Sequence, residues 1–227
     1  MSYTAKIFPL KDRQPHLLLM EQTNRFIIFI DSYNSYINIK ELTMSNERKM
    51  IYLCLAHMSD EGLEQKYIKE AFDTNWVVPL GPNVNGFEQD LKEFVGKDQQ
   101  GLMKEVVALS AGTAAVHLAL IACGVKPGDE VCVQSFTFCA SSHPITYLGA
   151  TPVFIDSERD TWNMDPVLLE KAIVERKQIT GKYPKAIIPV ALYGMPYNAE
   201  RIISIAAKYD IPVIEDVAEG FGRTGDC

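Results

Sequence analysis

The sequence lacks the features that mark several large classes of protein. Its five cysteines form no Cys-x-x-Cys pair, which argues against a zinc site and a disulfide framework and favours a reducing compartment. The apolar run at residues 26–30 is too short to cross a bilayer, and no signal-peptide cleavage site follows the N-terminus. Basic residues are in the minority, and the net charge of −7 argues against a nucleic-acid or membrane partner. We therefore expect a cytoplasmic protein.

The first part of the chain differs from the rest. Residues 1–49 show no sustained helical or strand period, although 227 residues suffice for a sizeable core. A small accessory segment would explain this, and so would a non-native or poorly ordered leader with initiation at Met44 or Met50. We adopt the second explanation because the regular pattern begins only later. The predicted division is a leader at 1–49 and a domain at 50–227.

Two helix-like segments come first, and strand-like and helix-like segments alternate after residue 100. The expected strands are 105–109, 130–134, 152–156, 185–190 and 211–216. The expected helices are 61–73, 84–95, 114–122, 139–147, 165–177 and 198–209. Asp165 and Pro166 suit the N-cap and first position of a helix. Repeated βα units predict an α/β fold with a mostly parallel sheet flanked by helices.

A small-residue turn lies between the first expected strand and its helix. Unpaired backbone N–H groups and the positive end of the helix dipole meet at Gly112 and Thr113, which suits one phosphate group. A turn needed only for strand–helix packing explains the same residues. The segment is neither Gly-x-Gly-x-x-Gly nor a P-loop, which makes a dinucleotide-dependent oxidoreductase a poorer alternative.

Three informative positions fall at expected strand ends, where parallel α/β sheets bind ligands: Gly112-Thr113, Phe138 and Asp216. A flat phosphorylated ring with a protonated nitrogen, such as pyridoxal phosphate (PLP), would use all three. Its phosphate would bind at the helix start, its ring on Phe138 and its nitrogen beside Asp216. Each residue also has a plainer explanation, since Phe138 suits an apolar core and Asp216 suits a helix N-cap.

Seven short motifs occur in a fixed order. They are residues 74–76 (TNW), 81–82 (GP), 110–118 (SAGTAAVHL), 127–131 (PGDEV), 135–138 (SFTF), 192–194 (LYG) and 213–219 (VIEDVAE). Together they resemble the DegT/DnrJ/EryC1/StrS family of PLP-dependent sugar aminotransferases, over roughly residues 50–223. The resemblance implies an aspartate-aminotransferase-like large domain (PLP fold type I) in a homodimer, with the site at the subunit interface.

The resemblance also implies an activity and a cofactor site. The family transfers an amino group, commonly from glutamate, to a nucleotide-linked keto-sugar in surface polysaccharide or glycan biosynthesis. Gly112, Thr113 and Ala114 would hold the phosphate of PLP. Phe138 would stack on its ring, and Asp216 would pair with its pyridine nitrogen.

Four further positions follow from the resemblance. Glu219 stands where the family often has glutamine beside the ring hydroxyl, although a solvated first-turn acid is the plainer explanation. Trp76, Gly81 and Pro82 would lie near the sugar-nucleotide entrance, although a hydrophobic anchor is the plainer explanation of Trp76.

One expected residue is missing. The Schiff-base lysine of the family should follow Asp216, and residues 217–227 contain no lysine. We therefore assign no catalytic residue and expect no covalent link to PLP. The expectation is a chain truncated before the small C-terminal domain and inactive alone. The alternative is a non-catalytic module that binds phosphate ligands or dimerises.

Overall fold

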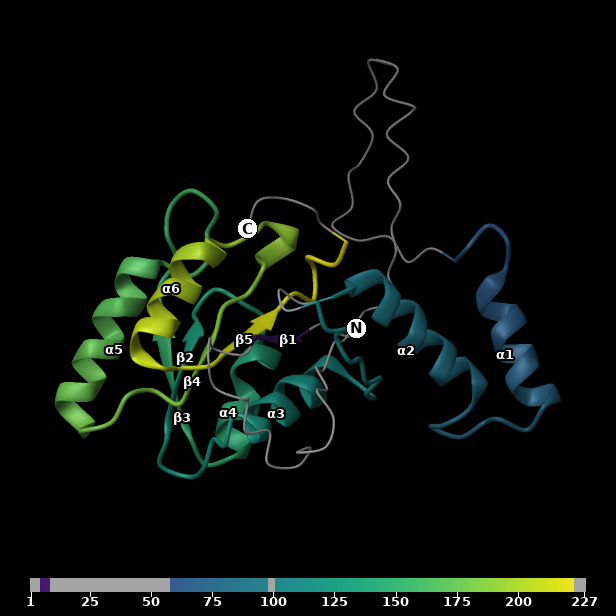
Figure 1. The fold of residues 1–227 in the computed structure, drawn as a ribbon, viewed down its shortest axis with the longest axis horizontal. Coiled ribbons are helices and arrows are strands. Elements are labelled where there is room, and N and C mark those ends of the chain that lie inside the picture. The colour runs from purple at the N-terminus through teal and green to yellow at the C-terminus, as the bar shows by residue number, and fades with distance from the viewer. Residues whose placement is uncertain (1–4, 9–57, 98–100, 223–227) are drawn as a thin grey trace, which may run out of the picture.

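Five strands form a single sheet in the order β1-β5-β4-β2-β3 (Figure 1). The computed structural model describes residues 5–8, 58–97 and 101–222. Its strands are β1 (Ala5–Phe8), β2 (Glu130–Gln134), β3 (Thr151–Ile155), β4 (Ala186–Ile188) and β5 (Val213–Asp216). Strands β2 to β5 pair in parallel, and β1 pairs antiparallel to β5.

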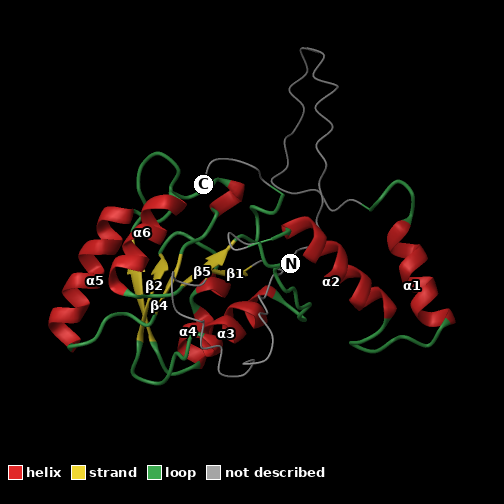
Figure 2. Cartoon of the chain, in the orientation of Figure 1, coloured by secondary structure: helices red, strands yellow, loops and turns green. Residues whose placement is uncertain are grey.

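Helices flank the sheet and extend beyond it (Figure 2). They are α1 (Leu63–Asp73), α2 (Pro82–Val95), α3 (Gly112–Ala122), α4 (His143–Tyr147), α5 (Pro166–Thr180) and α6 (Ala199–Tyr209). Two short 3₁₀ helices follow strand ends, η2 (Cys139–Ser141) after β2 and η3 (Leu192–Gly194) after β4. The predicted α/β class with a mostly parallel sheet is confirmed.

Side chains alternate between the two faces of the sheet. Val131 and Val133 pack in one apolar cluster with α3 and α4, whereas Cys132 between them packs in a second cluster with α5 and α6. Ile188 and Ile187 divide in the same way. This period of two explains why these strands are apolar throughout, since both faces are covered.

Helix caps follow the sequence signals. The Asp165 side chain accepts hydrogen bonds from the backbone N–H groups of Val167 and Leu168, at 2.7 and 3.3 Å, and Pro166 begins α5. The Asn198 side chain accepts from Arg201 N–H at the start of α6. These bonds satisfy donors that a helix start leaves unpaired.

Two predicted elements are wrong. Residues 105–109 form no strand; the Ala108 N–H donates to Glu88 Oε1 of α2 at 2.8 Å instead of to a neighbouring strand. Val106 of this segment is buried and packs beside Leu91 of α2. The apolar pattern therefore reflects burial against α2 and not strand pairing. The continuous helix at 139–147 is divided into η2 and α4, because Pro144 has no N–H to continue the ladder.

Four residues of the predicted leader lie within the described part of the chain. Ala5–Phe8 pair with β5 in the register Ala5↔Asp216, a strand that the sequence did not predict. The other residues of 1–49 lie outside the described residues, so the boundary at residue 50 stays a prediction.

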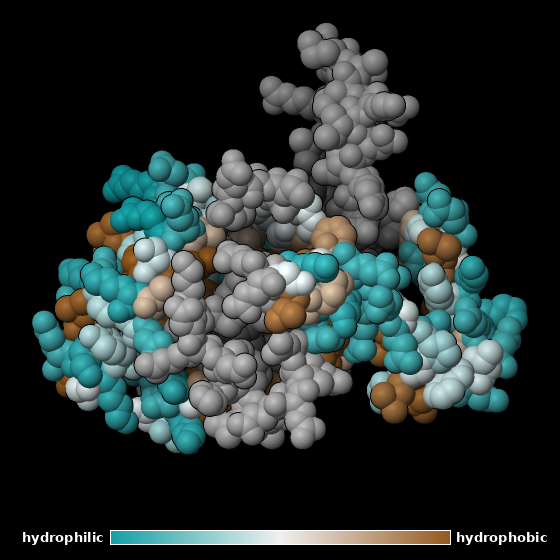
Figure 3. All heavy atoms as spheres, viewed as in Figure 1, coloured by the Kyte–Doolittle hydropathy of each residue, from teal (hydrophilic) through white to brown (hydrophobic). Residues whose placement is uncertain are grey.

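Helix α1 lies on the far side of α2 from the sheet and has no buried residue (Figure 1). Apolar side chains are exposed on it, among them Ile68 and Phe72, and Figure 3 shows apolar patches over this region. Helix α2 is anchored through Leu91, which is 7% exposed. Within the described ranges, none of the helices has the length and apolar character needed to span a membrane.

The central strand offers a test of the core. Ile187 is 0% exposed, whereas Val174 on α5 is 37% exposed. We expect Ile187→Ala to lower the free energy of unfolding by about 2–5 kcal/mol, because it removes buried contacts and leaves a cavity. Val174→Ala should change it by roughly 0.5 kcal/mol or less. Urea unfolding followed by circular dichroism measures both, and equal effects would contradict this description of the core.

Candidate functional site

The start of α3 carries unpaired backbone donors. Its N-cap residue Ala111 is extended and makes no side-chain cap, and the first helical bond runs from Ala115 N–H to Ala111 C=O at 3.1 Å. The N–H groups of Gly112, Thr113 and Ala114 precede that bond, so the helix itself supplies them no acceptor. Such a helix start, with the positive end of its dipole, can hold an anion.

The direction of α3 places this start at the carboxyl end of the sheet. A Cβ added to Gly124, just after the helix, would lie 3.6 Å from the Lys185 side chain, and Lys185 immediately precedes β4. The end of α3 therefore lies at the amino edge of the parallel strands. Because α3 also packs against β5 and η2, its start lies toward the carboxyl edge.

Asp216 is the last residue of β5 and is only 2% exposed. Ser141 Oγ donates to its Oδ2 at 2.6 Å, and the Ala218 N–H donates to its Oδ1 at 3.3 Å. Burial raises the pKa of Asp216 to about 6, while the two hydrogen bonds lower it and the Glu219 charge raises it. A turn rather than a helix follows β5, so the N-cap explanation of Asp216 is wrong.

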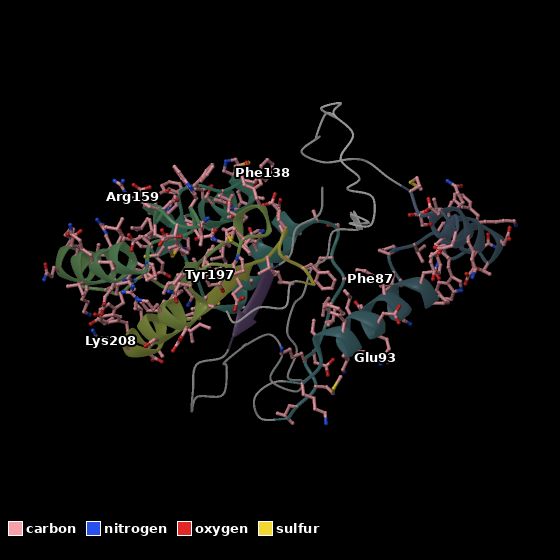
Figure 4. The ribbon with its side chains drawn as sticks, turned by 90° about the horizontal axis from the view of Figure 1, so that it is seen from above. Phe87, Glu93, Phe138, Arg159, Tyr197 and Lys208 are labelled. Atoms are coloured by element: carbon pink, nitrogen blue, oxygen red, sulfur yellow. The ribbon has the colours of Figure 1, made fainter. Side chains whose placement is uncertain are left out.

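Phe138 precedes η2 and is 54% exposed, so it is not a core residue. Figure 4 shows it at the margin of the molecule. Its carbonyl accepts the Ser141 N–H at 3.1 Å, and Ser141 in turn holds Asp216. The structure thus joins the predicted aromatic ring and the predicted carboxylate through one short segment.

Glu219 is exposed, and its carboxylate accepts the Tyr193 N–H at 2.5 Å. A Cβ added to Gly194 would lie 2.9 Å from the Glu219 carbonyl oxygen, and Gly194 has a φ of +78°. Glycine is therefore required at this contact between the segments that follow β4 and β5. The predicted position of Glu219 beside a ring hydroxyl stays a prediction.

Two buried amides at the carboxyl edge were missed by the sequence analysis. Gln134 Oε1 accepts the Met164 N–H at 2.8 Å, and Gln134 Nε2 donates to the Phe136 carbonyl at 2.9 Å. Asn163 Oδ1 accepts the Leu192 N–H at 3.0 Å and also contacts Gln134 Nε2 at 3.3 Å. Gln134 had one local signal, a polar residue at the end of an apolar strand, whereas Asn163 lies in the connection between β3 and α5 and had none.

Above these amides lies a cluster of exposed rings. The ring centroid of Phe136 is 6.2 Å from that of Trp162 and 6.4 Å from that of Tyr193, both nearly edge-on. Trp162 and Tyr193 have positive φ values of 63° and 51°, so the backbone turns sharply at both.

Trp76, Gly81 and Pro82 lie in a separate place. Gly81 has a φ of +127°, and a Cβ there would lie 2.9 Å from the Trp76 ring, so the indole packs on the glycine. Pro82 is the first residue of α2. The connection between α1 and α2 is drawn away from the sheet in Figure 1. Their predicted place near a substrate entrance stays a prediction.

Comparison with known proteins connects this geometry to a family. The model of the DegT/DnrJ/EryC1/StrS aminotransferase family matches residues 59–226. The chain belongs to this family.

Two curated relatives illustrate the likeness. EpsN of Bacillus subtilis (strain 168), placed by its name among the pyridoxal phosphate-dependent aminotransferases, is 53% identical over 174 residues, which are 77% of this chain and 42% of EpsN. GDP-perosamine synthase of Caulobacter vibrioides is 39% identical over 176 residues, which are 74% of this chain and 44% of that enzyme. The chain thus spans less than half the length of both relatives.

A solved structure supports the fold assignment. The crystal structure of NtdA from Bacillus subtilis, with bound cofactor PMP, is 31% identical with a TM-score of 0.64, over 74% of this chain and 36% of that one. The predicted fold of the PLP-dependent aminotransferase large domain is therefore confirmed over this part.

The donor set fits PLP. A phosphate needs several converging N–H donors, which α3 supplies at Gly112–Ala114. A pyridine nitrogen that is to hold a proton needs a carboxylate, and Asp216 is held by donors on both oxygens.

The raised pKa of Asp216 predicts a dependence of stability on pH. Because its pKa is about 6 in the folded protein against an ordinary 3.8, the native state binds more protons between these values. The contribution of Asp216 to the free energy of unfolding is therefore present at low pH and is lost as the pH rises through 6. Asp216→Asn lacks the titrating group. Between pH 4.5 and 7 the unfolding free energy of the wild type should therefore fall by about 2 kcal/mol relative to that of the variant. Urea unfolding across this range checks it, and parallel profiles would contradict it.

Proposed function

We propose that the chain supplies the PLP-binding part of an aminotransferase that acts on a nucleotide-linked keto-sugar. The single observation that carries this proposal is the buried Asp216 carboxylate, held at a strand end by the same segment that presents Phe138. Family membership supports the reaction class, and the similarity to a GDP-perosamine synthase supports a nucleotide-sugar substrate. Glutamate as amino donor and a place in surface polysaccharide synthesis complete the proposal.

When bound, PLP supplies an electron sink that stabilises negative charge on the substrate carbon next to nitrogen. The residues of this chain bind and orient it. The backbone N–H groups of Gly112–Ala114 would hold the phosphate, and Phe138 would cover one face of the ring and exclude water from it. Asp216 would hold a proton on the ring nitrogen, because its ionised carboxylate would pair with the N–H⁺ form.

Amino-group transfer also needs a lysine amine that moves protons at the substrate carbon. Lys185 lies at the opposite, amino edge of the strands, near Gly124. Lys208 forms an ion pair with Glu170 on the helical layer. Since residues 217–227 also contain no lysine, we propose that residues 1–227 bind PLP without a covalent bond.

A homodimer in the cytoplasm is part of the same proposal. Tyr67, Phe72 and Phe94 on α1 and α2 are 50%, 69% and 60% exposed, and a second copy would cover such apolar surface.

Equilibrium titration of the purified chain with PLP and with pyridoxal, followed by absorbance, tests the cofactor proposal. PLP should bind at least about tenfold more tightly than pyridoxal, because only PLP carries the phosphate that α3 holds. Phe138→Ala should weaken PLP binding about 3- to 10-fold through lost stacking.

Phe154 provides the matched control for this titration, because it is 57% exposed and lies on the edge strand β3. Phe154→Ala should leave the affinity unchanged. Equal affinities for PLP and pyridoxal, or equal effects of the two substitutions, would refute the proposal.

A further inference from the structure

Two hydroxyl groups form a row of contacts that ends at the Asp216 carboxylate. Thr137 Oγ1 lies 2.9 Å from Ser141 Oγ, and Ser141 Oγ lies 2.6 Å from Asp216 Oδ2. Ser141 is 1% exposed and Asp216 is 2% exposed, so the hydrogen bond between them is shielded from water. Thr137 is half-buried and begins the row.

The protons of this row have one arrangement while Asp216 is ionised. A carboxylate only accepts hydrogen bonds, so the single hydroxyl proton of Ser141 points at Asp216 Oδ2. The Ser141 oxygen is then left as an acceptor, and Thr137 donates to it. Both donors are oriented toward the negative charge, and hydrogen bonds to an ionised group are the stronger kind.

The surroundings of Asp216 make this donor important. Burial opposes the charged form of the carboxylate, and Glu219, on the turn after β5, adds a like charge. Of the titratable side chains on neighbouring elements, Cys139 of η2 is exposed and His117 of α3 lies edge-on to the Tyr147 ring. The Ala218 N–H and the Ser141 hydroxyl act in the opposite direction, and Ser141 makes the shorter bond.

We propose that Ser141, itself oriented by Thr137, is a positioning residue that fixes the plane of the Asp216 carboxylate and keeps it ionised to receive the protonated ring nitrogen of the cofactor. This inference rests on the proposed function for the identity of the ring. Ser141 acts through Asp216 and does not contact the cofactor. With Oδ2 held by Ser141 and Oδ1 by the Ala218 N–H, the carboxylate cannot rotate away without breaking a buried hydrogen bond.

The test is a ¹³C NMR titration of the Asp216 carboxyl group in the chain without PLP. Ser141→Ala should raise the midpoint by about one pH unit or more, because a charge-assisted hydrogen bond to the ionised form is lost. Ser141→Thr keeps the hydroxyl and should restore a midpoint close to the wild type.

The matched control is Ser142→Ala. The Ser142 hydroxyl lies on the same turn but donates to the Cys139 carbonyl at 3.3 Å, so its loss should not move the midpoint. Thr137→Val keeps Ser141 and removes its donor, so it should raise the midpoint in the same direction by a smaller amount. This variant carries the test if Ser141→Ala fails to fold.

Two outcomes overturn the inference: a midpoint unchanged in both Ser141→Ala and Thr137→Val, or an equal shift in Ser142→Ala. A parallel PLP titration separates this result from the proposed function. Ser141→Ala should weaken PLP binding more at pH 7 than at pH 8.5, where the carboxylate is ionised in either protein, whereas Ser142→Ala should match the wild type at both. If the wild type fails to bind PLP while the midpoints shift as expected, the proposed function fails and the positioning of Asp216 stands.

Discussion

The site depends on one buried carboxylate at the end of β5. Removing a charge from water is unfavourable, and a protein retains such a group only where hydrogen bonds offset the loss. Asp216 receives one bond from the 3₁₀ helix after β2 and another from the turn that follows its own strand. The requirement therefore constrains two segments that are 75 residues apart in sequence to lie together.

The same need to satisfy polar groups organises the rest of the carboxyl edge. Gln134 ends β2 in a place with 0% exposure, where its amide must find partners inside the protein. It finds them in the backbone of the segments that precede α5 and follow β2, and Asn163 extends the network to η3. Segments without regular structure thus acquire fixed positions from two side-chain amides.

Local signals in the sequence sufficed for much of the fold. The apolar runs that became β2 to β5 and the caps at Asp165 and Asn198 depend on neighbouring residues, which a sequence displays directly. Local signals were insufficient at residues 105–109, because burial against α2 and pairing in a sheet produce the same apolar pattern. The 139–147 helix failed at Pro144, a breaker whose effect depends on its place within the turn.

The candidate site shows the same difference between local signals and contacts of distant residues. Gly112, Phe138 and Asp216 were candidates because each lies at or just after the end of an expected strand, whether or not that strand paired in the structure. Ser141, Gln134 and Asn163 were not, because the contacts that connect them to other elements join residues 29 or more positions apart in sequence. Hydrogen bonds over such distances follow from the packing of strands, which composition and spacing do not specify.

The amide network has a consequence for how this surface can diverge. Gln134 and Asn163 bond to the backbone of the segments that carry Phe136 and Tyr193, whereas the side chains of Phe136, Trp162 and Tyr193 are exposed. Substitution of these rings can change the exposed surface and leave the amide hydrogen bonds in place, because those bonds are to backbone groups.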